Sequence, residues 1–379
     1  MRVLFVIRSL NTGGGAERQL GHLARGLTAR GHGVAIAVMY PGGTLEQELE
    51  ERHGIPILRL AKRSRWDTVT FAYRSIGLAR GFNPDIVHGY MSGANELALF
   101  LGAALRRPTV WGIRVSDQDF GDYTRFRELV FQLGIPLSRF PALIIANSNK
   151  GREFHLAKGF PAARFEVVPN GIDLARFTRN AVRGAEWRAQ HQVEASTQLI
   201  VLPARFEPMK DHRTFIEAAR LTSAAREDVR FLALGRGSET QRGALEVLVR
   251  ECGVADRVSF QPDESRVEDL YNAADMVTLT SAFGEGFPNV LGEAMSCARM
   301  CVSTDAGDAK VVIGDAGRIV PVRSPDALSQ AWLELLALTP AHRADLERRA
   351  RTRIEENFGT ELLIDVTLRH FEAALARSR

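Results

Sequence analysis

Two carboxylates, Glu285 and Glu293, stand on either side of a Gly-Phe-Pro turn, with seven residues between them. Residues 275–281, just before them, have the alternating apolar pattern of a buried strand, and residues 290–297 have the pattern of a short apolar helix. The segment is therefore predicted to be a strand, a turn and a helix. Glu285 lies in the predicted turn and Glu293 about one turn into the helix, so both carboxylates can serve a ligand at the helix start.

The start of this helix has no side chain that would cap it. Pro288 suits the first helical position because it lacks only an N–H group that would be unpaired there, and neither Gly286 nor Phe287 is a capping residue. We expect three backbone amides to be open to an outside acceptor, those of Asn289, Val290 and Leu291. A helix start with open amides and an outward-directed dipole binds phosphate. Glu293 could then hold a pair of ribose hydroxyls, and Glu285 would face the group that the phosphate carries.

Two cations in the second half of the chain can point into one cleft. Arg205 ends an apolar strand pattern, and Lys210 comes just before a helix for which Asp211 is a good cap. Taken alone, the two cations would be ordinary surface residues. Beside the two glutamates we expect them to belong to the same site.

The string from Phe283 to Met295 resembles the donor-site signature of the retaining, nucleotide-sugar-dependent glycosyltransferases of the GT-B fold. It has the Glu-x7-Glu spacing and the Gly-Phe-Pro-Asn interior of the large family that contains bacterial mannosyl-, galactosyl- and N-acetylhexosaminyltransferases. Two further segments resemble the same family, the Gly-Gly-x-Glu-Arg loop at residues 14–18 and the Pro-Asn-Gly-Ile-Asp segment at residues 169–173. The matches are spread over most of the chain.

The resemblance implies an α/β protein of the GT-B fold, in which two Rossmann-like domains with mostly parallel sheets face each other across a cleft. Short apolar runs that alternate with helical patterns agree with a parallel sheet. We place an acceptor-side domain at residues 1–170 and a nucleotide-sugar-binding domain at residues 171–359, because the Asn-Gly turn at 170–171 precedes a polar stretch. The last helix, residues 360–379, would pack back on the first domain.

The resemblance also implies a role for each matching residue. Arg205 and Lys210 would clamp the donor pyrophosphate. Glu285 would hold hydroxyls of the transferred sugar, and His88 would lie near them, so these four are the predicted catalytic residues. The predicted donor-binding set consists of Arg205, Lys210 and Glu285 together with Gly14, Gly15, Gly235, Gly237, Pro262, Gly286, Phe287, Pro288, Asn289, Val290, Leu291 and Glu293.

Strand ends in the first half carry the remaining candidates. His88 closes one apolar run, and Arg114 follows another; ligands gather at such ends in open parallel sheets. We place Arg114 and Asn170 on the acceptor side, although relatives often carry a His near Arg114, so the acceptor chemistry stays open. Asp117 and Asp119 have the spacing of a metal-binding Asp-x-Asp motif. We reject that function because they lie in the wrong half and the family that the chain resembles uses no such metal.

Length and composition limit the class of protein. A chain of 379 residues with 45% hydrophobic and 25% charged residues is typical of a two-domain globular protein. Residues 1–170 carry 22 Lys and Arg against 14 Asp and Glu. Basic spots at residues 62–66 and 105–107 could meet anionic lipid head groups, although solvated basic faces without a partner are as common. No nucleic-acid-binding signature accompanies the charge, so nucleic acid is not an expected partner.

The chain has no apolar run of eighteen residues, and Arg8 interrupts its apolar start. We therefore expect a first strand rather than a signal peptide. The three cysteines, Cys252, Cys297 and Cys301, form no Cys-x-x-Cys pair and suit a reducing compartment. The expected location is the cytoplasm, with peripheral attachment to the inner face of the cell membrane if the basic spots bind lipid.

The function implied by the resemblance is the transfer of a hexose or N-acetylhexosamine, with retention, from a UDP or GDP sugar to a hydroxyl. The implied acceptor is a glycan or lipid-linked intermediate of cell-surface glycan synthesis, and no cofactor or essential metal is expected. Two alternatives stay open, a nucleotide-sugar epimerase of the same fold and a non-catalytic nucleotide-sugar-binding protein. A nicotinamide oxidoreductase is remote, because the third glycine of a Gly-x-Gly-x-x-Gly motif would fall on Arg18.

Overall fold

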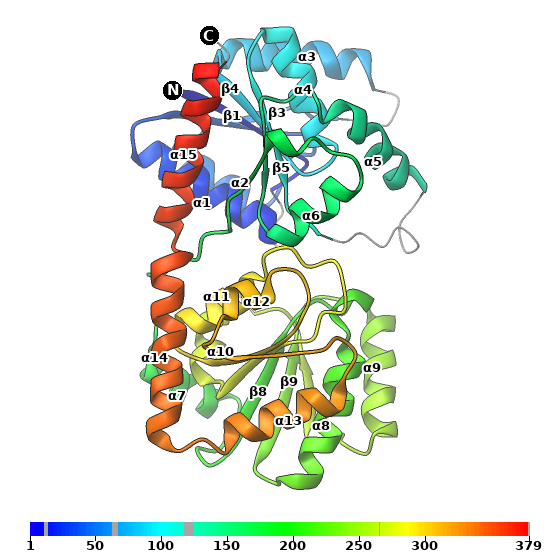
Figure 1. Cartoon of the computed structure of the whole chain (residues 1–379), viewed down its shortest axis with the longest axis vertical. Coiled ribbons are helices and arrows are strands. Elements are labelled where there is room, and N and C mark those ends of the chain that lie inside the picture. Colours follow the sequence, from blue (N-terminus) through cyan, green and yellow to red (C-terminus); the bar gives the residue numbers. More distant parts are fainter. Residues whose placement is uncertain (11–13, 63–66, 117–124, 265, 378–379) are drawn as a thin grey trace. The chain divides into compact units, whose positions relative to one another are not determined.

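The computed structural model describes residues 1–10, 14–62, 67–116, 125–264 and 266–377, and of residues 125–127 it describes the backbone alone. The chain divides into two compact units (Figure 1). Unit 1 consists of Met1–Gly171 and Thr360–Arg379, and unit 2 of Ile172–Gly359. The sequence predicted transitions after residues 170 and 359, whereas the first transition in the structure follows Gly171.

Unit 1 contains a seven-stranded parallel sheet in the order β3-β2-β1-β4-β5-β6-β7. Its strands are β1 (Arg2–Ile7), β2 (Gly33–Val38), β3 (Ile57–Arg59), β4 (Ile86–Tyr90), β5 (Thr109–Ile113), β6 (Leu143–Ala146) and β7 (Phe165–Val167). Most of their side chains are buried because helices cover both faces, which is why these strands are apolar runs rather than alternating patterns. The order reverses between β1 and β4, where ligands bind in sheets of this kind.

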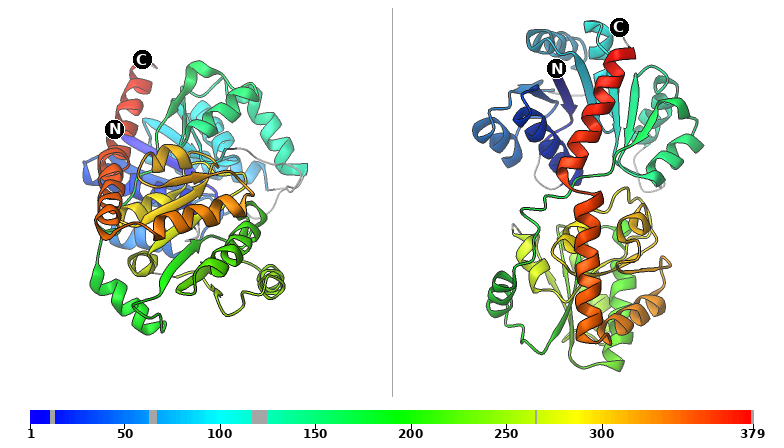
Figure 2. Two further views of the ribbon diagram at one scale, coloured as in Figure 1. Left: turned by 60° about the horizontal axis from the view of Figure 1, so that its bottom comes forward. Right: turned by 60° about the vertical axis from the view of Figure 1, so that its left-hand side comes forward.

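The helices of unit 1 pack on the two faces of this sheet. They are α1 (Gly15–Ala29), α2 (Thr44–Gln47), η1 (Glu48–Arg52), α3 (Val69–Phe82), α4 (Ala94–Leu105), α5 (Arg125–Leu137), α6 (Asn149–Ala157), η3 (Ala162–Arg164) and α15 (Thr360–Arg377). Leu23 of α1 and Ile364 and Phe371 of α15 share a core cluster with Phe5 of β1. The last helix therefore lies beside the first one (Figures 1 and 2). The sequence predicted that this helix packs on the first domain, and it belongs to unit 1.

Unit 2 contains a six-stranded parallel sheet in the order β10-β9-β8-β11-β12-β13. Its strands are β8 (Gln198–Pro203), β9 (Val229–Leu234), β10 (Val258–Gln261), β11 (Met276–Leu279), β12 (Met300–Thr304) and β13 (Arg318–Val320). This is the Rossmann order, and its reversal lies between β8 and β11. Two Rossmann-like units with parallel sheets confirm the predicted α/β class.

The helices of unit 2 bury both faces of its sheet. They are α7 (Ala181–Gln190), η4 (Pro208–Lys210), α8 (His212–Ala225), α9 (Glu239–Glu251), α10 (Val267–Ala273), α11 (Asn289–Ser296), α12 (Ala309–Ile313), α13 (Pro325–Leu336) and α14 (Pro340–Asn357). Val201 of β8 packs in one core cluster with Leu291 of α11, whereas its neighbour Leu202 packs in another with Phe215 of α8. Successive side chains of a strand point to opposite faces, so each strand contributes to both cores.

Candidate functional site

The reversal of strand order in unit 2 brings two loops together. One follows β8 and runs into η4, and the other follows β11 and leads to α11. The Thr280 hydroxyl donates a hydrogen bond to the Lys210 carbonyl (2.7 Å), and the Ala282 amide donates to the Met209 carbonyl (2.9 Å). The predicted cations and the predicted turn carboxylate therefore lie on loops that are tied to each other.

Lys210 and Glu285 form an ion pair at this point. The Lys210 ammonium donates to Glu285 Oε1, and the Ser281 hydroxyl donates to the same oxygen at 2.6 Å. Both charged side chains are largely buried, at 14% and 10% exposure. Burial alone would raise the pKa of Glu285, but the Lys210 charge and hydrogen bond, the Ser281 hydroxyl and the Arg205 charge together lower it. Glu285 is therefore held as a carboxylate.

Arg205 lies beside this pair but is more exposed. Its side chain is 56% exposed and pairs with Glu207 at 2.8 Å. Its charge also contributes to the lowered pKa of Glu285. The charges of Arg205 and Lys210 thus both act on Glu285, and Arg205 is exposed enough to contact a ligand from solvent.

Helix α11 differs in detail from its prediction. Asn289 is its first residue, so Pro288 is the N-cap rather than the first helical residue, and no side chain caps the helix, as expected. The Leu291 amide donates to the Pro288 carbonyl at 3.1 Å. The expectation that this amide is open is therefore wrong, because the chain folds back in a tight first turn. The predicted phosphate site therefore lacks the Leu291 amide, and phosphate binding at this helix start remains a prediction.

Glu293 lies on the buried side of α11 and is 6% exposed. Its Oε2 accepts a hydrogen bond from the Tyr271 hydroxyl of α10 at 2.9 Å. Tyr271 is a residue that the sequence reasoning missed, since an aromatic residue in an apolar helix gives no sign of its hydroxyl's partner. The ribose contact expected of Glu293 remains a prediction.

Glycines bring the backbones of neighbouring loops into close contact around these charged residues. A Cβ at Gly235 would overlap the Ala204 carbonyl oxygen, and one at Gly237 would lie 2.6 Å from Phe206 Cβ. The Gly235 amide donates to the Gln261 carbonyl (3.1 Å), next to Pro262. Packing of the loop after β8 thus explains these glycines by itself, and their contact with a nucleotide stays a prediction.

Gly307, after β12, was not among the predicted site residues. It has a φ of +58°, and a Cβ there would lie 2.5 Å from the carbonyl oxygens of Glu285 and Gly286. The Asp308 amide also donates to the Gly286 carbonyl at 2.9 Å. The loop after β12 therefore packs against the backbone of Glu285 and Gly286. Phe287, between the turn and the helix, is buried against Phe358, with ring centroids 5.3 Å apart.

The glycine loop of unit 1 lies at the end of β1. Gly14 is the N-cap of α1, and Gly15 is its first residue. The remaining glycine of the triplet, Gly13, lies outside the described residues. Gly14 and Gly15 thus stand at the reversal of strand order in their own sheet, and their contact with donor phosphates remains a prediction.

The placement of His88 at a strand end is wrong. The strand continues to Tyr90, so His88 lies in the middle of β4, where it is fully buried. Its ring contacts Phe5, Tyr90 and Phe371, with centroids 5.5, 4.9 and 5.4 Å away. Burial, and then the charge of Arg114, lowers the pKa of His88 well below its usual value. His88 is a neutral core residue here, and the role predicted for it in catalysis is untested.

Arg114 and Asn170 do lie together. Arg114 follows β5 directly and is 8% exposed. Its Nη1 donates to Asn170 Oδ1 (3.2 Å) and its Nη2 to the Tyr90 hydroxyl (2.6 Å), while the guanidinium carbon lies 4.3 Å from the centre of the Tyr90 ring. Tyr90 is a further residue that the sequence reasoning missed. Asp117 and Asp119 lie outside the described residues, and the part of the chain that the structure describes holds no cluster of three or more His, Cys, Asp or Glu residues suited to a metal.

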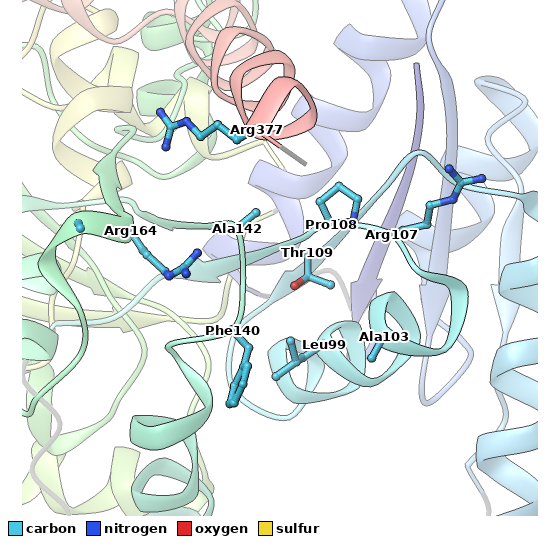
Figure 3. A pocket seen from close by; sticks show the side chains of 10 residues that line it. Leu99, Ala103, Arg107, Pro108, Thr109, Phe140, Ala142, Arg164 and Arg377 are labelled. Atoms are coloured by element: carbon cyan, nitrogen blue, oxygen red, sulfur yellow. The ribbon is translucent and has the colours of Figure 1, made fainter. Parts of the chain in front are cut away.

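A hollow of about 620 Å³ lies at the opposite, amino-terminal edge of the unit 1 sheet (Figure 3). It is lined by Leu99, Ala103, Arg107, Pro108, Thr109, Phe140, Ala142, Ala163, Arg164 and Arg377. A second hollow of about 210 Å³ shares Arg107 and adds Arg80 and Arg106. Neither lining contains an Asp or Glu. The two linings together contain five arginines, which we call the arginine edge: Arg80, Arg106, Arg107, Arg164 and Arg377.

Family models match both halves of the chain. Residues 13–176 match the model described as Glycosyltransferase Family 4, and residues 197–338 match the model described as Glycosyl transferases group 1. A D-inositol 3-phosphate glycosyltransferase of Xylanimonas cellulosilytica is 31% identical over 55% of this chain and 50% of its own length. The putative glycosyltransferase EpsF of Bacillus subtilis is 28% identical over 57% of this chain and 55% of its own. The matched segments thus span about half the length of these curated relatives.

Solved structures match nearly the whole chain. HepE of Anabaena, in complex with UDP-glucose, has a TM-score of 0.85 at 21% identity and covers 98% of this chain and 100% of its own. The predicted GT-B fold is therefore confirmed. Both halves of the chain are thus similar to glycosyltransferases, each through its own family model.

Within the described residues, no helix is both long and apolar enough to cross a membrane.

Proposed function

We propose that the chain transfers a hexose or N-acetylhexosamine from a nucleoside-diphosphate sugar to a hydroxyl acceptor, with retention. The observation that carries this proposal is the buried Lys210–Glu285 pair beside Arg205, at the strand-order reversal of unit 2. That pair lies in the segment that matches the group 1 glycosyltransferase model. HepE was solved with UDP and with UDP-glucose, which supports UDP sugars as the first donors to test.

The chemistry requires a diphosphate to leave with its charge. Fixed cations that hold the diphosphate most tightly as it departs lower this barrier, because they stabilise charge that develops in the transition state. Arg205 is open to such a group, and Lys210 is held in place by Glu285 and by the loop contact of Thr280. In this proposal Glu285 also accepts hydrogen bonds from donor-sugar hydroxyls, Glu293 binds the ribose, and no metal takes part.

Lys210→Ala tests the cationic clamp. Removal of one donor that stabilises developing charge typically lowers the rate by about two to three decades. The measurement is UDP release and labelled-sugar transfer from UDP-glucose across a panel of hydroxyl acceptors. The control is Arg213→Ala, since Arg213 is an exposed cation three residues further on that pairs with Glu217. Undiminished transfer by Lys210→Ala would remove the clamp, and epimerisation of the donor without acceptor would identify an epimerase instead.

We propose further that the acceptor is a glycan or lipid-linked intermediate of cell-surface glycan synthesis, used at the cytoplasmic face of an anionic membrane. The arginine edge supports this part of the proposal. Its arginines surround hollows without acidic residues, and Phe140 at the rim is 69% exposed. Cations beside an exposed aromatic ring are typical of surfaces that meet anionic lipid head groups.

A further inference from the structure

Arg114 is a buried cation without a negatively charged partner among the described residues. It is 8% exposed, and in the described part of the chain it forms no ion pair with a carboxylate. Asn170 and Tyr90 each accept one of its hydrogen bonds, and both are neutral side chains. A guanidinium has five N–H donors, and the Nε–H of Arg114 finds no acceptor in the part of the chain that the structure describes. A charge in this state is costly unless an anion completes its surroundings.

The surroundings of Arg114 belong to the ligand edge of the unit 1 sheet. Strands β4, β5, β6 and β7 are neighbours, and Tyr90, Arg114, Asn147 and Asn170 stand at or just after their carboxyl ends. Ile113 and Ala146 are paired in register, so Arg114 and Asn147 are the next residues on adjacent strands. Asn147 Oδ1 is also buried, and no described residue donates a hydrogen bond to it. Met91, which follows Tyr90, is 38% exposed, so solvent reaches this edge.

We propose that Arg114 binds an oxyanion of the acceptor, a phosphate or carboxylate group, and thereby selects anionic acceptors. This inference rests on the proposed function and assigns a chemical class to the acceptor. Arginine suits the task because its planar fork matches the geometry of phosphate and carboxylate oxygens. Tyr90 and Asn170 hold the fork by its two terminal nitrogens and so orient it before the acceptor arrives.

The first experiment uses inorganic phosphate as the probe and leaves acceptor identity aside. The full chain is saturated with UDP, which occupies the diphosphate site of unit 2, and phosphate is titrated while the melting temperature is followed. We expect phosphate to stabilise the wild type and Arg114→Gln to bind it about ten- to hundredfold more weakly. Arg164→Gln removes an arginine from the opposite edge of the same unit and should behave like the wild type.

Two results would overturn the inference. One is a wild-type chain that phosphate does not stabilise, and the other is equal stabilisation of Arg114→Gln. If Arg114→Gln does not fold, Arg114→Lys takes its place, because it keeps the charge but loses the fork; it should bind phosphate more weakly than the wild type.

The second experiment compares acceptors with and without the anion. Inositol 3-phosphate and inositol form a matched pair, chosen because relatives are named for the former. We expect Arg114→Gln to raise KM for the phosphorylated acceptor with little change for the neutral one, whereas a merely structural role would impair both equally. Transfer of labelled sugar by the wild type reports on the proposed function. Absence of transfer to either acceptor from every nucleotide sugar tested contradicts that function, while the phosphate titration still decides the role of Arg114.

Discussion

At the scale of single residues, the Lys210–Glu285 pair determines the charge of the candidate donor site. Both side chains are largely buried and have lost hydration, and the attraction between the two opposite charges offsets that loss. The folded state lowers the pKa of Glu285 below its ordinary value of 4.5. Folding is therefore favoured by the ionised form. This contribution is fully present above about pH 4.5 and is lost as the pH falls through the folded-state pKa.

Glu285→Gln tests this pair through stability. At pH 7 the variant leaves the Lys210 ammonium buried without its partner, and we expect a loss of about 3 kcal/mol in the free energy of unfolding. The difference from wild type should narrow as the pH falls from 4.5 through the folded-state pKa, because protonation of Glu285 then removes the stability that the wild-type pair contributes. Denaturant unfolding at several pH values measures this. Glu217→Gln, which removes one partner of an exposed pair, should cost less than about 1 kcal/mol; a gap independent of pH would contradict the account.

At the scale of elements, the loops after β8, β11 and β12 form one support for the site. The loop after β8 bonds to the loop after β11 through Lys210 and Met209, and the loop after β12 packs on the carbonyls of Glu285 and Gly286. These three strands lie next to one another in the sheet, so their carboxyl ends meet at one edge. The position of Glu285 is therefore set by a neighbouring loop as well as by its own turn.

Gly307→Ala tests this support. The left-handed φ of +58° disfavours a side chain at Gly307, and a Cβ there would overlap the carbonyl oxygens of Glu285 and Gly286. The loop must therefore shift. We expect a destabilisation of about 1–3 kcal/mol and roughly tenfold weaker binding of UDP-glucose, measured by calorimetry. The matched control is Gly253→Ala, which has a φ of +69° but open space around it. It should lose stability yet keep UDP-glucose binding; equal binding by both variants would argue against the support.

At the scale of the whole molecule, charge is distributed unequally between the two units. Unit 1 carries 25 Lys and Arg against 17 Asp and Glu, and unit 2 carries 24 against 28. Part of the excess in unit 1 gathers at the arginine edge, which lies at the other end of the sheet from Arg114. Attachment to a membrane through this edge would leave the ligand edge of the same sheet in water.

The triple variant Arg107→Gln, Arg164→Gln, Arg377→Gln tests this attachment. Each cation near an anionic lipid surface contributes about 1 kcal/mol, so vesicle binding should fall roughly a hundredfold. Co-sedimentation with vesicles of phosphatidylglycerol and phosphatidylcholine measures it. A control of equal charge removes Arg213, Arg242 and Arg348, three exposed arginines of unit 2. Similar losses in both variants would show a general charge effect, and no loss in the first would exclude the arginine edge.

The sequence by itself was enough to predict the α/β class, the place of the domain boundary, the return of the last helix and the uncapped start of α11. These features depend on local patterns, since periodicity, turns and caps are properties of neighbouring residues. The roles predicted for Arg205, Lys210 and Glu285 toward a diphosphate sugar came from the resemblance to a known family, because local patterns alone suggested ordinary surface residues. The resemblance to a known family also assigned distant segments of the chain to one predicted site, which local patterns alone could not do.

Tertiary structure alone decided which of these residues meet. Lys210 pairs with Glu285, Tyr271 with Glu293, and Arg114 with Tyr90 and Asn170, across separations of 22 to 75 residues. Such contacts follow from the order of strands in a sheet, which sequence periodicity does not encode. The position of His88 shows the same limit, because two more residues of β4 moved it from the strand end into the core. Residue types thus indicated which chemical groups the chain offers, whereas only the fold showed which side chains contact each other.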